Sequence, residues 1–218
     1  MVGMLDFARD AEGCRHPPFG SVASATARTE PVGTVASYSD GQRIYSDGQR
    51  ASRIYEVERG AVRVCHTLAD GRRQILAFHL PGEWFGFEAN NVHRFSAEAI
   101  GNTSLRGANL PGGADFPWSL FSPVLRNLAL AEQHQLVIGR SCACERVGAF
   151  LIEMAERQGR PASLTLMMSR TDIADYLGLT NETVSRSFSK LRARGIVRLH
   201  GISGVEIAKW NALMELCA

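Results

Sequence analysis

The chain has 218 residues, of which 45% are hydrophobic and 21% are charged, and its formal net charge is +2. This composition is sufficient for a packed core and excludes a chain that is disordered throughout. No run approaches the roughly 18 consecutive apolar residues of a membrane span, and the first residues lack the pattern of a secretory signal. Five scattered cysteines, an odd number, do not form a disulfide framework. We therefore expect a cytoplasmic protein with no membrane partner.

The basic excess lies in the last quarter of the chain. Residues 161–218 contain seven Arg or Lys and five Asp or Glu, whereas residues 1–160 contain seventeen of each class. Five of the cations follow one another with no acid between them: Arg186, Lys190, Arg192, Arg194 and Arg198. Such a run fits either a solvated helix face or a surface that binds nucleic acid, and charge alone does not decide.

The first half of the chain predicts a tail followed by a β-domain. Residues 1–34 are rich in Ala, Gly, Ser and Pro without a sustained period, which indicates a loosely ordered tail. Residues 35–118 contain short strand-like runs separated by Asp-Gly and Pro-Gly turns, with strands expected at 53–57, 61–68 and 74–80. This spacing favours an antiparallel β-roll, or jelly roll. The hexapeptide Tyr-Ser-Asp-Gly-Gln-Arg occurs twice, from Tyr38 and from Tyr45, and is too short for a solenoid repeat.

A long helix is expected over residues 119–139, with Ser122 as N-cap and Pro123 in the first turn. Residues at alternating steps of three and four form a heptad seam with one polar member: Phe121, Val124, Leu128, Ala131, Gln135 and Ile138. The seam fits a parallel homodimer, and the alternative is a helix buried against its own domain. Leu125 and Leu136 lie beside the seam and could pack on the β-roll instead.

The last domain, residues 140–218, predicts a winged helix-turn-helix. An amphipathic helix is expected from Glu145 to Gln158. Ser169 and Asp172 then form a capping box at the start of a short helix, which ends in a turn at Gly178. Thr180 caps the next helix, residues 181–192, and residues 196–207 predict a hairpin wing from which Arg198 can reach phosphate.

The outer face of the second helix carries Glu182, Ser185, Arg186 and Ser189, opposite an apolar face. Arginine can donate two hydrogen bonds to guanine, and glutamate can accept one from cytosine. Because Glu182 and Arg186 are one turn apart, they can address one base pair or two neighbouring pairs. The alternative is an exposed ion pair one turn apart, worth a few tenths of a kcal/mol.

The segment 168–186 resembles the helix-turn-helix of the Crp/Fnr superfamily, and most of all its FixK branch. Further segments resemble that branch, among them Asp70 to Ile75, Phe78 to Glu83 and Glu145 to Val147, so that the resemblance covers roughly residues 35–208. It implies an α+β chain with a β-roll like that of cyclic-nucleotide-binding domains, a dimerisation helix and a winged helix-turn-helix. It further implies a homodimeric regulator, most often an activator, of genes for nitrogen fixation, microaerobic respiration or denitrification, with RNA polymerase as a partner.

The resemblance also implies roles for single residues on double-stranded DNA. Glu182, Ser185 and Arg186 are expected to read a TTGA-type half-site, and two subunits a TTGA-N6-TCAA-like palindrome. Nine polar residues are expected to contact the DNA backbone or to support the helices: Ser169, Arg170, Thr180, Asn181, Thr183, Ser189, Lys190, Arg192 and Arg198.

The sequence departs from relatives that bind a cofactor. Cyclic-nucleotide-binding members resemble one another in adjacent Arg and Ser or Thr residues, but residues 92–97 here read Val-His-Arg-Phe-Ser-Ala. Cys14 is the one cysteine of the tail, too few for the iron–sulfur cluster of Fnr-type members. We therefore expect no cofactor and no metal. The alternative is DNA binding gated by haem, nitric oxide or another small molecule in the β-roll.

Two further possibilities concern thiols and metals. Cys65 and His66 are neighbours on a strand, so a core thiol beside a surface imidazole is expected rather than a pair of haem ligands. Cys142 and Cys144 lie near a helix N-terminus, where the pKa of a thiol can fall, which raises the possibility of redox control. A cupin-like metal enzyme would use His79 and Glu83, but no His-x-His completes such a site. Because no catalytic set of residues is evident, we do not expect an enzyme.

Overall fold

The structure of this chain is a computed structural model that describes residues 33–109 and 117–217, so most of the predicted tail lies outside the described residues. The described residues form one compact unit. No helix in the described part of the chain is long and apolar enough to cross a membrane.

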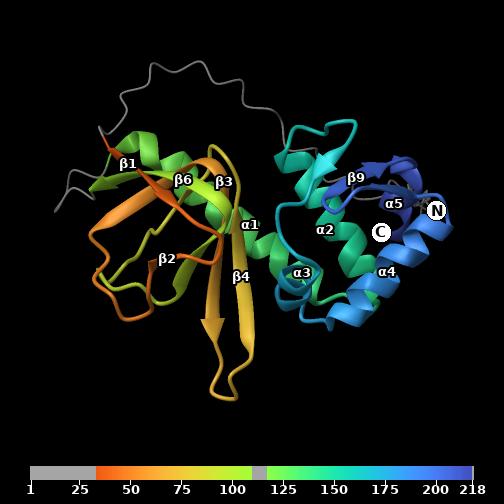
Figure 1. The fold of residues 1–218 in the computed structure, drawn as a ribbon, viewed down its shortest axis with the longest axis horizontal. Helices are drawn as coiled ribbons and strands as arrows, with labels where there is room; N and C mark the ends of the chain where they lie inside the picture. Colours follow the sequence, from red (N-terminus) through yellow and green to blue (C-terminus); the bar gives the residue numbers. More distant parts are fainter. Residues whose placement is uncertain (1–32, 110–116, 218) are drawn as a thin grey trace, which may run out of the picture. The chain divides into compact units, whose positions relative to one another are not determined.

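The first half folds into an antiparallel β-domain (Figure 1). Its sheet order is β1-β6-β3-β4, with β2 paired to β6 and β5 paired to β3. The strands are β1 (Thr34–Tyr38), β2 (Arg43–Tyr45), β3 (Arg53–Thr67), β4 (Arg73–His79), β5 (Trp84–Phe85) and β6 (Ser96–Asn109). The predicted β-roll is thus confirmed.

Strand β3 is longer than expected, because the two strands predicted at 53–57 and 61–68 are one continuous strand. Gly60 lies at an irregularity in its pairing with β6 and has a φ of 83°. A Cβ at this position would lie 2.5 Å from Oγ1 of Thr103, so only glycine fits the bend. The glycine lets the strand bend without ending.

The duplicated hexapeptide forms the same turn twice. In the first copy the backbone N–H of Ser39 donates to Oε1 of Gln42 at 2.9 Å, and in the second that of Ser46 donates to Oε1 of Gln49 at 3.1 Å. The glycine of each copy has a positive φ, 71° and 78°. The local sequence therefore specifies the turn in both places.

A short 3₁₀-helix, η1 (Trp118–Leu120), leads into the long helix α1 (Phe121–Ile138). The expectation that Ser122 caps this helix is wrong: Leu120 occupies the N-cap, and no side chain caps it. Continuation from the 3₁₀ turn replaces the cap, because the backbone of Phe121 donates to the carbonyl of Trp118. On its inner side, α1 buries His134 and Val137.

The last part of the chain contains the two predicted helices of the helix-turn-helix, packed on a third helix and on a small sheet. The elements are α2 (Ala143–Arg157), β7 (Leu164–Thr165), α3 (Arg170–Leu177), α4 (Asn181–Ala193), β8 (Val197–His200), β9 (Gly204–Ile207) and α5 (Trp210–Leu216). Strands β8 and β9 form the expected wing, and β7 adds a third strand that was not predicted. Helix α5, also not predicted, buries Leu213.

One hydrophobic core joins the β-domain to the helices. Ile75 and Phe78 of β4 belong to the same buried cluster as Phe150 of α2 and Tyr176 of α3. Tyr176 lies 5.0 Å, ring centre to ring centre, from Phe78. The helix-turn-helix is therefore packed against the β-domain and not only tethered to it.

Candidate nucleic-acid interface

Helix α3 begins in the capping box that the sequence predicts. The backbone N–H of Asp172 donates to Oγ of Ser169 at 3.0 Å, and the backbone N–H of Ser169 donates to Oδ2 of Asp172 at 3.1 Å. The helix ends at Gly178, which has a left-handed φ of 64°. A β-carbon would be strained there, so this glycine makes the sharp turn into α4 possible.

Helix α4 begins at the predicted cap, since the backbone N–H of Thr183 donates to Oγ1 of Thr180 at 3.2 Å. Its apolar face is buried through Val184, Phe188 and Leu191. The opposite face is exposed and carries the residues predicted to read bases: Glu182, Ser185, Arg186 and Ser189. The two-sided pattern in the sequence thus corresponds to one buried face and one open face.

Arg186 and Glu182 form an ion pair along this open face, one helical turn apart. Their side chains are 73% and 71% exposed. Exposed pairs of this kind contribute little to stability, so either partner can exchange the contact for a DNA base at small cost.

Other predicted DNA-contacting residues are divided between open positions and internal contacts. Lys190 and Arg192 are exposed, on the last turns of α4. Ser189 donates to the carbonyl of Ser185 at 3.0 Å, and Asn181 donates to Oγ1 of Thr171 at 3.4 Å. Asn181 therefore links α4 to α3, and the hydroxyl of Ser189 is bound within its own helix, while the two cations are exposed to solvent.

Arg170 has a contact that the sequence did not indicate. Its guanidinium lies 3.3 Å from the ring centre of Phe188, so it stacks on the core of α4. Burial lowers the pKa of this arginine. Arg170 thus ties α3 to α4, a supporting role that needs no phosphate.

The wing carries a small charged cluster. Glu206 accepts from Nη1 of Arg198 at 2.7 Å and lies 3.0 Å from Nε2 of His200. Arg198 remains mostly exposed, so it can still reach a phosphate. Ile202, at the tip of the wing, is fully exposed.

Glu83, the last residue of the segment from Phe78 to Glu83, is bound by an arginine of the last domain. Nη2 of Arg157 lies 2.6 Å from Oε2 of Glu83, and Nη1 lies 2.7 Å from Oε1 of Glu153. Only 5% of the Arg157 side chain and 2% of the Glu153 side chain are exposed. Tyr176 adds a hydrogen bond to Glu153 at 3.3 Å. We call Glu83, Glu153, Arg157 and Tyr176 the buried joint.

The pKa values within the buried joint follow from these contacts. Burial raises the pKa of Glu153, and Arg157 only partly opposes it. For Glu83 burial is again the largest effect and acts in the same direction, but the charge and the hydrogen bond of Arg157, together with His79 and the backbone N–H of Leu80, outweigh it and hold the pKa below its usual value. The carboxylate of Glu83 therefore serves to connect β-domain and α2.

A cavity of about 350 Å³ lies beside the joint, lined by Phe85, Phe95 and His79 of the β-domain and by Leu130 of α1. His79 is buried, and its Nδ1 has no hydrogen-bond partner in the described structure. Burial lowers the pKa of His79 to about 4. Within residues 33–109 and 117–217, no group of three or more His, Cys, Asp or Glu could hold a metal ion. The carboxylate of Glu83, which the cupin-like alternative would use as a ligand, is instead paired with Arg157.

Three of the four cysteines that the structure describes are buried: Cys65, Cys144 and Cys217. Cys65 is buried and His66 is half-buried, on opposite faces of β3 as expected. The possibility of a low pKa is wrong for Cys144, because burial raises the pKa of its thiol. Cys142 is exposed, and Cys14 lies outside the described residues.

Helix α1 has one face on the β-domain and one face open. Asn127 donates to the carbonyl of Trp84 at 2.9 Å. Within the predicted seam, Val124 and Ile138 are half-buried, whereas Phe121, Leu128, Ala131 and Gln135 are exposed. The idea that Leu125 and Leu136 pack on the β-roll is wrong, since both are exposed, Leu136 by 71%. The exposed apolar residues of α1 therefore form a stripe that includes Leu125 and Leu136 and is rotated about the helix axis relative to the predicted seam.

Comparison with known proteins agrees with this architecture. Residues 145–216 match the Crp-like helix-turn-helix domain family, and residues 35–109 match the cyclic nucleotide-binding domain family. The nitrogen fixation regulation protein FixK of Rhizobium meliloti (strain 1021) is 49% identical over 183 residues, which cover 84% of this chain and 87% of that protein. FixK of Azorhizobium caulinodans is 38% identical over 213 residues, covering 90% of this chain and 86% of that protein.

A solved structure has the same fold. The structure of FixK2 from Bradyrhizobium japonicum is 41% identical in sequence and superposes with a TM-score of 0.80, covering 86% of this chain and 98% of that one. These relatives share both the β-domain and the helix-turn-helix described above. The chain therefore belongs to the Crp/Fnr superfamily of transcription regulators, and within it to the FixK branch.

Proposed function

We propose that this protein binds a TTGA-N6-TCAA-like palindrome as a homodimer, and that α4 of each subunit reads one half-site. The observation that carries the proposal is the exposed polar face of α4, where Glu182 and Arg186 lie one turn apart above a fully buried apolar face. Arg186 would donate to guanine, Glu182 would accept from cytosine, and Ser185 would lie between them. Lys190, Arg192 and Arg198 would bind phosphate without regard to sequence.

The homodimer is supported by the open face of α1. Phe121, Leu125, Leu128 and Leu136 are all large, apolar and exposed along this one helix. A second copy of α1 would cover them and would set the distance between the two α4 helices. Leu136→Glu should shift the mass measured by sedimentation equilibrium from dimer toward monomer, whereas Ser122→Glu, which introduces the same charge at an exposed position of the same helix beside the apolar stripe, should leave the dimer intact.

The protein would act in the cytoplasm on genes for nitrogen fixation, microaerobic respiration or denitrification, in most cases as an activator that contacts RNA polymerase. Support comes from the relatives, which are named as nitrogen fixation regulation proteins. A reporter gene behind a promoter with the palindrome should rise in expression when the protein is supplied. A fall in expression would indicate a repressor at that site.

Sequence-specific binding is tested by fluorescence anisotropy on the palindrome and on a scrambled duplex, at fixed salt, with reductant and without added ligand. Arg186→Ala should cost about 1–3 kcal/mol on the palindrome and relax the preference at its guanine. Arg192→Ala is the matched control, because it removes the same charge from the same helix and should weaken both duplexes alike. Equal losses on both duplexes for Arg186→Ala would contradict the base-reading role.

The second candidate function keeps the DNA role and adds a small-molecule signal in the β-domain. The cavity beside His79, with an unpartnered buried nitrogen, favours it. A visible Soret band after incubation with haem, or palindrome binding that appears only after a ligand is added, would support this candidate. Full discrimination by the ligand-free protein would favour the first.

A further inference from the structure

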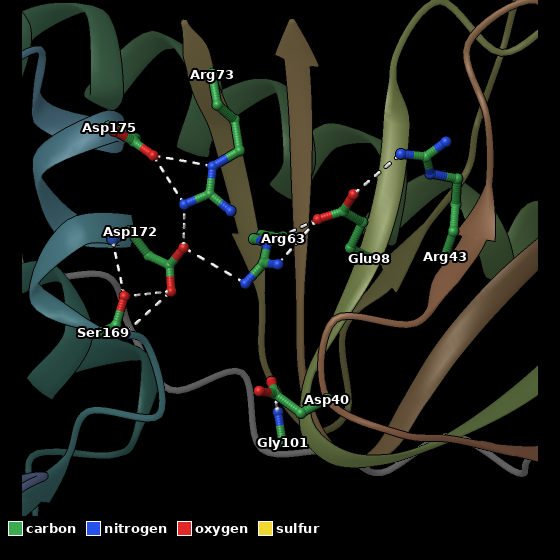
Figure 2. A network of polar contacts seen from close by, with 9 residues as sticks. All are labelled: Asp40, Arg43, Arg63, Arg73, Glu98, Gly101, Ser169, Asp172 and Asp175. Atoms are coloured by element: carbon green, nitrogen blue, oxygen red, sulfur yellow. Dashed lines mark hydrogen bonds and ion pairs between the residues drawn. The ribbon is translucent and has the colours of Figure 1, made fainter.

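Two arginines of the β3–β4 hairpin contact the first helix of the helix-turn-helix (Figure 2). Nε and Nη2 of Arg73 lie 2.9 and 2.8 Å from Oδ2 of Asp175, and Nη2 also lies 2.6 Å from Oδ1 of Asp172. Arg63 reaches the same oxygen of Asp172 at 3.4 Å and is itself held by Glu98 at 2.9 Å. We call Arg63, Arg73, Asp172 and Asp175 the hairpin clasp.

The hairpin clasp is partly buried and connected. Asp172 is buried, and Arg63, Arg73 and Asp175 are shielded from most of the solvent around them. Ion pairs in such positions are less screened than surface pairs, and a network of charge-assisted hydrogen bonds fixes direction as well as distance. The clasp is therefore able to hold α3 in one orientation.

Asp172 belongs to the clasp and to the capping box at the same time. Its Oδ2 accepts from Ser169, and its Oδ1 accepts from the two arginines. The clasp thus holds the first turn of α3, and α3 carries α4 through the turn at Gly178 and the stack of Arg170 on Phe188. A rotation of α3 would consequently move the face that bears Arg186.

The recognition face stays open while the clasp is closed. Arg186 and Glu182 remain more than two-thirds exposed, although Asp172 and Asp175 are bound to the hairpin. The clasp therefore does not cover the residues that would read bases. This arrangement fits a contact that aims the helix-turn-helix rather than one that blocks it.

We propose that the hairpin clasp is a positioning device: it sets the direction of α4 relative to the β-domain and thereby the half-site spacing that the homodimer accepts. The proposal rests on the proposed function, because spacing has meaning only for a dimer on a palindrome. Half-sites read by a symmetric dimer lie about one helical turn, roughly 34–36 Å, apart, so a small change in the direction of each α4 alters the preferred spacer. Arg63, Arg73 and Asp175 are positioning residues that do not touch DNA.

The test compares Arg73→Met with Arg72→Met. Arg72 is the neighbouring residue of the same hairpin and pairs with Asp70 in the turn at 2.7 Å, outside the clasp. Both variants lose one positive charge, and Asp172 stays unchanged because it also caps α3. Anisotropy is measured on palindromes with spacers of five, six and seven base pairs and on a single half-site.

Arg73→Met should weaken binding to the preferred palindrome by about tenfold, in line with the loss of charged hydrogen bonds, and should reduce the preference among spacers. Its affinity for the single half-site should match that of Arg72→Met. The swap Arg73→Glu with Asp175→Arg should restore the spacer preference that Arg73→Glu alone loses. Equal spacer preferences in Arg73→Met and Arg72→Met would overturn the proposal.

A second measurement separates this proposal from the proposed function. Hydrogen–deuterium exchange of the free protein should be faster in α3 for Arg73→Met than for Arg72→Met, with equal exchange in the strands of the β-domain. If the wild-type protein shows no preference for a palindrome, the proposed function fails. The exchange data alone then test whether the hairpin clasp holds α3. Unchanged exchange in α3 would then overturn it.

Discussion

Arg157 and Arg186 each pair with a glutamate one turn earlier in their own helix, and Arg157 also pairs with Glu83 of the β-domain. The two arginines differ in their access to water. Arg157 is almost fully buried between Glu83 and Glu153, whereas Arg186 lies beside Glu182 on the open face of α4. A buried charge cannot lose its partner without a large penalty, while an exposed charge can exchange its partner for water or DNA. An arginine–glutamate pair therefore connects the β-domain to α2 where it is buried, and it leaves its side chains accessible to a partner where it is exposed on α4.

The largest effect is expected for Arg157→Met. Removing the guanidinium leaves Glu153 buried without the charge of Arg157 and leaves Glu83 with the half-exposed Arg126 in its place, which should lower the free energy of unfolding by about 3–5 kcal/mol. The measurement is urea unfolding at pH 7. Arg126→Met is the control, because Arg126 also lies near Glu83, at 3.5 Å, but is half exposed and should cost less than about 1 kcal/mol. Equal losses of unfolding free energy in Arg157→Met and Arg126→Met would contradict the distinction between buried and exposed pairs.

A second test uses pH at His79, whose pKa burial lowers to about 4. Between pH 6.5 and 4 the unfolded chain binds a proton at this residue and the folded chain does not, so stability falls as the pH falls. The expected loss by pH 4.5 is on the order of 2–3 kcal/mol. Urea unfolding at pH 7.0, 5.5 and 4.5 should show a shallower decline for His79→Leu than for the wild-type protein, and parallel curves would contradict the assignment.

An intermediate effect is expected where the partner is a backbone group. Ser169→Ala removes the cap of α3 and should lower the free energy of unfolding by about 1 kcal/mol. Thr180→Ala removes the matching cap of α4 and should have a similar effect, while binding to scrambled DNA stays nearly unchanged. A loss as large as that of Arg157→Met would show that the cap also holds the hairpin clasp together.

The smallest effect is expected for Glu182→Gln. Because the ion pair with Arg186 is exposed, the free energy of unfolding should change by less than about 0.5 kcal/mol. Binding to the palindrome should fall if glutamate accepts from cytosine, and thermal unfolding with anisotropy separates the two quantities. A change in unfolding without a change in binding would assign Glu182 to stability instead.

The helix-turn-helix was predictable because its signals are local. Capping residues, a glycine turn and one apolar face define α3 and α4 within about 25 residues, and the wing follows from its hairpin turn. The long helix was also predictable from periodicity, and β3, β4 and the wing strands β8 and β9 from their apolar runs and turns, whereas β1, β2, β5, β6 and β7 were not named in advance. The N-cap at Ser122 was not, because the preceding 3₁₀ turn replaces the cap and leaves no distinct signal.

Contacts between distant segments could not be predicted. Arg73 and Asp175 are about 100 residues apart, and no local pattern connects them. The same holds for Glu83 and Arg157, and for the stack of Arg170 on Phe188, since the sequence left open whether Arg170 contacts the DNA backbone or supports the helices. The face of α1 that remains open also depends on how the β-domain packs, which is why Leu125 and Leu136 were misplaced.

The two identical turns have a consequence for how the chain finds its register. Since each hexapeptide builds the same turn, local chemistry cannot distinguish the native alignment from one shifted by seven residues. The native alignment is instead favoured by Tyr45, which is buried with its ring centre 3.6 Å from that of His93, whereas Tyr38 is only half-buried. Burial of one aromatic ring thus distinguishes the two copies of the hexapeptide and fixes the alignment in which the first strands of the sheet pair.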